Sequence, residues 1–198
     1  MTLITMPTSP AFIDCDWGIS RTVGLSESPF TGESQVHSYP RAKWEATLTL
    51  PPMKRSQASQ WQAFFMQCEG RANTFLLGDP DAKEIVSENV PSSISISSDA
   101  AIGATEVSLT IGAGKELNSG SYLQFFTGAN SVLHMVVDDN TGDGSVTIQP
   151  PLKVAITTST PVNFTEAQGV FRMDSNDLRW STDQVSLYGI TFSCSEAI

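Results

Sequence analysis

The chain has 198 residues, a length that allows one large β domain or two small ones, and its formal net charge is −10 with 40% hydrophobic and 16% charged residues. An acidic surface repels phosphate backbones, so this composition disfavours nucleic-acid binding through a basic patch. The sequence shows no apolar run long enough to span a membrane, and its first residues lack the basic and apolar regions of a signal peptide.

The first 40 residues predict an arm followed by a β-hairpin. Residues 1–17 show no clear periodicity, and we expect an extended arm whose end packs on the domain. Residues 19–26 and 35–39 are typical of short strands, and the turn residues of 28–32 separate them. Proline cannot donate to a β-ladder, so Pro40 is expected to end the second strand. Two strands joined in this way form a hairpin that can project from the body.

The stretch from Trp44 to Pro80 predicts a strand, a helix and a second strand. Apolar and polar residues alternate over residues 44–50, as they do in a strand with one buried face, and Pro51 and Pro52 end it. We expect the helix to begin at Ser56 as N-cap and to stop at Gly70. The apolar stripe of this helix follows spacings of three and four: Ala58, Trp61, Phe64, Phe65 and Cys68.

Residues 75–77 form a short apolar strand that the turn residues Gly78 to Pro80 close. In this strand–helix–strand unit we expect the largest apolar side chains to hold the fold together. The expected structural core residues are Trp44, Leu48, Trp61, Phe64, Phe65 and Phe75.

The composition changes after Pro80, where aromatic residues become rare and Ser, Thr and Gly become frequent. Short strands at regular spacing, separated by turn residues, are typical of small barrels and sandwiches. An OB-like barrel is the first interpretation of this region and a small sandwich the second. The five expected strands are residues 92–97, 106–111, 122–126, 132–137 and 145–149.

Aromatic-rich strands return near the C-terminus. We expect strands at residues 170–173, 178–181 and 184–194, the last with a β-bulge at Gly189, and a short strand or connector at 162–164. The predicted fold class is therefore mainly β: a β-sandwich-like domain with one α-helix, which contains an inserted small OB-like β-barrel. The discontinuous β domain comprises residues 1–88 plus 165–198, and the inserted barrel comprises residues 89–164.

The same stretches resemble a known protein family. The strand that ends at Pro51-Pro52, the Trp61-x-x-Phe-Phe helix with its trailing Gly70, and Phe75-Leu-Leu-Gly-Asp-Pro80 resemble the distal tail proteins of long-tailed, siphovirus-type bacteriophages. Ile148-Gln-Pro-Pro-Leu-Lys153 and Gly169-Val-Phe-Arg-Met173 resemble the same family.

The resemblance implies a structural adaptor of the virion tail tip that assembles in the bacterial host cytoplasm. It would form a homo-oligomeric ring, a hexamer, and would link the tail tube protein to the tail hub protein, without a membrane or a sequence-specific nucleic acid as partner. An acidic channel wall would let DNA pass without adhering, because like charges repel. Ring size and interface residues do not follow from the sequence.

The residues that could support catalysis or metal binding have simpler explanations. His37 and His134 lie on expected strands without a linked nucleophile, and we expect surface or partly buried histidines. The loop Asp138–Gly144 departs from the EF-hand pattern and is expected to be a hairpin turn, and Asp79 and Asp81 are expected turn residues. We therefore expect that the protein is not an enzyme and that it has no catalytic, cofactor-binding or metal-binding residues. A hydrolase is the remaining catalytic alternative.

Cys15, Cys68 and Cys194 are widely spaced, and we expect three reduced, buried thiols, as is usual for assembly in a reducing cytoplasm. The alternative function is a carbohydrate-binding module of the tail tip, in which the inserted barrel contacts the host surface. Sugar sites present exposed aromatic side chains, and the barrel region offers Tyr122, Phe125 and Phe126, which fit a core equally well.

Overall fold

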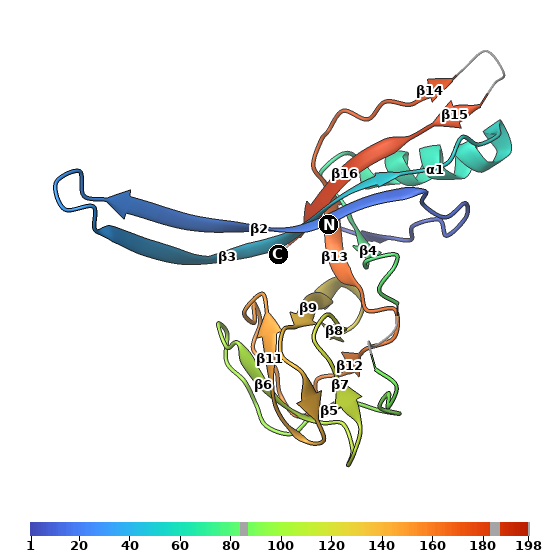
Figure 1. Cartoon of the computed structure of the whole chain (residues 1–198). Coiled ribbons are helices and arrows are strands. Elements are labelled where there is room, and N and C mark those ends of the chain that lie inside the picture. The colour runs from blue at the N-terminus through green and yellow to red at the C-terminus, as the bar shows by residue number, and fades with distance from the viewer. Residues whose placement is uncertain (84–86, 183–186, 198) are drawn as a thin grey trace.

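The computed structural model describes residues 1–83, 87–182 and 187–197 (Figure 1). The protein is mainly β with a single α-helix in this described part, and its strands form two six-stranded sheets and two small two-stranded sheets. The first sheet has the order β1-β4-β13-β16-β3-β2. Its strands are β1 (Leu3–Ile4), β2 (Asp14–Glu27), β3 (Ser34–Thr49), β4 (Thr74–Leu77), β13 (Gly169–Met173) and β16 (Thr191–Glu196).

The N-terminal arm is more ordered than expected, because β1 adds to the first sheet in parallel with β4 and β2 begins at Asp14. The arm between these strands packs on the domain as expected. The Phe12 ring lies edge-on to Trp61 at a centroid distance of 5.6 Å. Burial of this aromatic pair holds the arm against the body.

The alternation over residues 44–50 places one face of β3 in the core of the first sheet. Leu48 pairs with Phe192 and Ala46 pairs with Cys194, so apolar residues of neighbouring strands share this face. The helix α1 (Arg55–Cys68) packs its apolar stripe on them. All six residues expected to form the structural core are buried and belong to one cluster: Trp44, Leu48, Trp61, Phe64, Phe65 and Phe75.

The expected ends of the helix need correction. The helix begins at Arg55 with Lys54 as N-cap, and no side chain caps it, so Ser56 lies inside the first turn. At the other end, Glu69 is the C-cap with a φ of 49°, and Gly70 follows with a φ of 63°. The left-handed turn that stops the helix therefore begins one residue before the glycine.

Pro40 does not end a strand, contrary to the prediction. β3 runs without interruption from Ser34 to Thr49 and so joins two strands that the sequence predicts separately. The ladder with β2 passes from Arg21–Ala42 to Val23–Ser38, which leaves three residues of β3 opposite Thr22. A β-bulge is a place where a strand tolerates proline, because the extra residues are outside the hydrogen-bond ladder.

The second six-stranded sheet closes into a nearly complete barrel, which confirms the expected barrel-like region. Its order is β12-β8-β9-β11-β6-β5. An apolar cluster fills it, with Phe125 and Leu123 fully buried. A small pair formed by β7 (Glu116–Leu117) and β10 (Asn140–Thr141) was not expected, because the whole 138–144 loop was predicted to be a turn. The barrel strands are β5 (Ser95–Ile96), β6 (Glu106–Thr110), β8 (Tyr122–Phe125), β9 (Val132–Val136), β11 (Gly144–Gln149) and β12 (Val162–Asn163), and the 3-10 helix η1 is Gly128–Asn130.

The last expected strands are shorter than predicted. Only Ser181 of the 178–181 segment is in a strand, β14 (Ser181–Thr182), which pairs with β15 (Tyr188–Gly189). The expected strand 184–194 is divided at Ile190, and residues 184–186 of it lie outside the described residues. The division falls beside Gly189, where the sequence predicts an irregularity.

The barrel and α1 cover different parts of the same face of the first sheet. Phe192 packs on α1, whereas Trp44 at the other end of this face contacts Tyr122 of the barrel, with the two rings tilted and their centroids 5.6 Å apart. The Trp44 indole nitrogen Nε1 donates to the Leu133 carbonyl oxygen at 2.9 Å. The first apolar cluster therefore extends to Tyr122 and Leu133 of the barrel, and a second apolar cluster lies within the barrel itself. Autonomous folding of residues 89–164 stays a prediction, for which a test is given in the Discussion.

Candidate functional site: a projecting hairpin

The longest feature outside the body is the hairpin of β2 and β3 (Figure 1). Near its base β3 also pairs with β16, but that pairing stops at Glu45. Beyond this point, among the described strands, β2 and β3 pair only with each other. We call residues 20–43 the outer ribbon. The hairpin projects from the body, as the sequence predicts.

The outer ribbon exposes large apolar side chains to solvent. Leu25 and Val36 are directly opposite each other in the ladder, and they are 68% and 61% exposed. Val23, two residues before Leu25, is also exposed and shares its side of the strand. A contiguous apolar patch on a soluble protein commonly marks an interaction site.

The turn of the hairpin presents a single aromatic ring. Two backbone hydrogen bonds close this turn, from Ser28 N to the Glu33 carbonyl and from Gly32 N to the Ser28 carbonyl, both at 2.9 Å. Gly32 has a φ of 72°, a conformation that favours glycine. Between them Phe30 is 95% exposed. The sequence predicts only a turn at this position, and Phe30 is not among the residues that it singles out.

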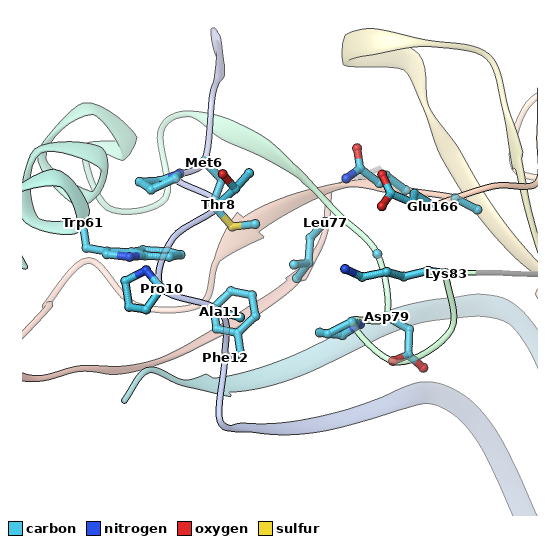
Figure 2. A pocket seen from close by; sticks show the side chains of 15 residues that line it. Met6, Thr8, Pro10, Ala11, Phe12, Trp61, Leu77, Asp79, Lys83 and Glu166 are labelled. Atoms are coloured by element: carbon cyan, nitrogen blue, oxygen red, sulfur yellow. The ribbon is translucent and has the colours of Figure 1, made fainter. Parts of the chain in front are cut away.

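A second feature is a cavity of about 240 Å³ beside the N-terminal arm (Figure 2). Met6 and Phe12 of the arm, Trp61 of α1 and Leu77 of β4 form its apolar part. The labelled Asp79, Lys83 and Glu166 lie together at the other end. In Figure 1 the arm forms a dark blue loop on the side of the first sheet away from the hairpin turn.

The charged end of the cavity is shaped by turn contacts. Asp79 Oδ1 accepts the amide of Asp81 at 3.1 Å, as the expected turn at these residues requires, and Asp79 Oδ2 accepts the Tyr122 hydroxyl at 3.3 Å. The Glu166 amide donates to the Lys83 carbonyl at 2.8 Å. Lys83 forms no ion pair with another described residue.

The two histidines have different environments. His37 is exposed on the outer ribbon. His134 is fully buried on β9, deeper than expected, with its Nδ1 at 2.7 Å from the Pro150 carbonyl oxygen. Burial lowers the pKa of His134 to about 4. The imidazole is therefore neutral at neutral pH and donates from Nδ1 to Pro150.

The acidic side chains of the 138–144 loop accept hydrogen bonds from neighbouring segments. Asp139 Oδ1 accepts the amide and hydroxyl of Ser119, and Asp143 Oδ1 accepts the amides of Ile111 and Gly112. Among the described residues no group of three His, Cys, Asp or Glu side chains is arranged to hold a metal ion.

All three cysteines are free thiols, as predicted, although Cys15 is only half-buried. Burial is the main cause that raises the pKa of Cys15 and of Cys68 to about 11, and it also raises the pKa of Cys194. Such thiols are unreactive because little thiolate forms at neutral pH.

The aromatic residues of the barrel do not form an exposed sugar platform. Tyr122 and Phe125 are buried, and Phe126 is half-buried against the barrel core. The Phe125 ring instead lies 5.4 Å from the His134 ring. A carbohydrate site built on these three residues would need exposed ring faces.

A scan against protein-family models finds no match, and a search of curated proteins finds no similar sequence. Within the described residues no helix is both long and apolar enough to cross a membrane.

Proposed function

We propose that the protein is a structural subunit that assembles with copies of itself into a ring. The observation that supports this proposal is the outer ribbon. A free two-stranded hairpin is marginally stable in water, and this one also exposes Leu25, Phe30 and Val36. A partner that covers the ribbon would remove both disadvantages.

A second copy is the partner that best fits the arrangement of one chain. The N-terminal arm, whose residues line the cavity, lies away from the turn of the hairpin (Figure 1), so a single chain does not bring Phe30 to the cavity. A contact between different surfaces of two copies repeats from copy to copy, and it closes into a ring when the rotation allows. In this arrangement Phe30 of one copy inserts into the cavity beside Phe12 of the next.

The resemblance to distal tail proteins extends the proposal to a biological setting. The ring would be part of a bacteriophage tail tip, between the tail tube and the tail hub, after assembly in the host cytoplasm. The net charge of −10 fits a channel that lets DNA pass without binding. Six copies, as the resemblance implies, is the expected ring size.

The test compares the full-length chain with two triple variants in native mass spectrometry over a range of concentrations. Wild type should form one closed oligomer. The ribbon variant Leu25→Ser, Phe30→Ser, Val36→Ser should remain a folded monomer. The matched control Ile102→Ser, Val137→Ser, Val154→Ser removes exposed apolar side chains from the barrel and should assemble like wild type.

Two results would contradict the proposal: a wild-type monomer at every concentration, or a ribbon variant that assembles normally. The cavity contact has a separate test, in which Phe30→Cys and Ala11→Cys are placed in a Cys15→Ala background. Oxidation should link neighbouring copies. A ring without this link would leave the ring proposal intact and exclude the cavity as the binding site of Phe30.

A further inference from the structure

A buried ion pair joins the barrel to the first sheet. Lys153, in the segment after β11, contacts the Oε2 atom of Glu196 at the end of β16. Their side chains are only 10% and 2% exposed. The same carboxylate oxygen accepts the backbone amide of Trp44 at 3.1 Å. We call Lys153 and Glu196 the junction ion pair.

The chemistry of this pair is poorly suited to stabilising the fold. Burial lowers the pKa of Lys153 and raises the pKa of Glu196, and their mutual attraction opposes both changes only in part. The second carboxylate oxygen of Glu196, Oε1, has no hydrogen-bond partner among the described residues. A buried pair that is incompletely hydrogen-bonded gains little over apolar residues of similar size.

The directional character of the pair is a better explanation for its presence. Apolar surfaces slide over one another at little cost, whereas a charged hydrogen bond fixes distance and angle. The remaining polar contacts here include Trp44 Nε1 to the Leu133 carbonyl, and the Val170 amide to the Ser131 carbonyl at 3.3 Å. We infer that the junction ion pair fixes the orientation of the barrel relative to the first sheet.

The barrel also contacts the base of the outer ribbon. Arg21, at the start of the outer ribbon, donates from Nη2 to Oε1 of Gln149 in the barrel at 3.0 Å. The barrel therefore contacts both the first sheet and the base of the ribbon. A barrel that is free to rotate would lose this support for the ribbon. The inference does not depend on ring assembly.

The test measures a distance between the two bodies in the full-length protein. Spin labels are attached at Gln60→Cys on α1 and Thr110→Cys on β6, both exposed positions, in a Cys15→Ala background. Labelled protein is diluted with unlabelled protein, so that only distances within one chain are observed. The variant of interest is Lys153→Met combined with Glu196→Gln, which removes both charges and keeps an acceptor for the Trp44 amide.

The double variant should melt near the wild-type temperature, and its distance distribution should broaden. Each single variant leaves one buried charge without its partner and should melt at a lower temperature. The matched control Lys43→Met, Glu45→Gln removes a partly exposed ion pair within β3 and should leave the distribution unchanged.

Three results would overturn the inference. The first is a double variant whose distance distribution coincides with that of wild type. The second is a double variant that melts as low as the single variants, which would make the pair a source of stability. The third is equal broadening in the Lys43–Glu45 control.

Discussion

The same two strands form the base of the hairpin and the outer ribbon, yet the two parts have opposite environments. At the base, Trp44 and Leu48 are buried by α1, the barrel and β16. In the outer ribbon, Leu25 and Val36 face solvent although they are paired in the same ladder. Strand pairing therefore does not determine burial. Apolar residues that the chain leaves uncovered are available to a surface outside it.

The largest expected effect is in the core between α1 and the base of the hairpin, where Trp61 of α1 belongs to the same apolar cluster as Trp44 and Leu48. Trp61→Ala should lower the free energy of unfolding by about 3–5 kcal/mol, because it removes a fully buried aromatic side chain and leaves a cavity. Phe30→Ala, in the turn of the ribbon, should change the stability of the monomer by less than about 0.5 kcal/mol. Urea denaturation of dilute protein measures both values. Similar losses for the two variants would remove the distinction between base and ribbon.

A comparable loss is expected in the barrel, but it should stay there. Phe125→Ala truncates a fully buried ring in the second apolar cluster and should cost about 3–5 kcal/mol. Hydrogen exchange should become faster in β6, β8 and β11 and remain unchanged in α1 and β4. Equal loosening of α1 would mean that residues 89–164 are not an autonomous insert and that the chain folds as one unit.

The pH dependence of stability can be compared between variants of the buried His134 and of the exposed His37. Unfolded His134 takes up a proton below about pH 6.5, whereas the buried imidazole stays neutral down to about pH 4. The unfolded state binds more protons in this interval. Lowering the pH through it therefore reduces the free energy of unfolding by about 3 kcal/mol on account of this residue.

Chemical denaturation at several pH values should show a flatter profile for His134→Gln than for wild type, by that amount. His37→Gln, on the outer ribbon, is the matched control, and its profile should follow wild type. A His134→Gln profile parallel to that of wild type would show that this imidazole titrates alike in the folded and unfolded states.

Local patterns account for the parts of the fold that the sequence predicts well. The alternation at Trp44–Leu50 and the helical spacing from Ala58 to Cys68 depend on neighbouring residues, and both elements form where expected. Pro40 was misjudged because a bulge depends on the register of two strands, which periodicity does not reveal. The parallel pairing of β1 with β4 is similarly non-local.

The candidate site was harder to predict than the fold. The hairpin was expected from its turn, but its exposed apolar face follows only once β16 is known to stop pairing at Glu45. The junction ion pair joins residues 43 positions apart in the sequence, from segments without a shared motif. Such contacts are set by the packing of whole elements on one another.

A small change in stability is also expected on the exposed apolar face of the outer ribbon. Leu25→Ser with Val36→Ser should alter the unfolding free energy of the monomer by less than about 1 kcal/mol, because both side chains are already exposed. Thermal melts of dilute protein measure this effect. A loss as large as that of Trp61→Ala would mean that the ribbon face is already buried in the monomer.

Hydrogen exchange at two protein concentrations tests most directly whether the outer ribbon is built for a second copy. The ladder amides at the base, such as that of Leu48, should be protected equally in dilute and concentrated protein. Those of the ribbon, around Leu25 and Val36, should exchange rapidly in dilute protein and become protected when copies assemble. Ribbon protection that is the same at every concentration would contradict the account.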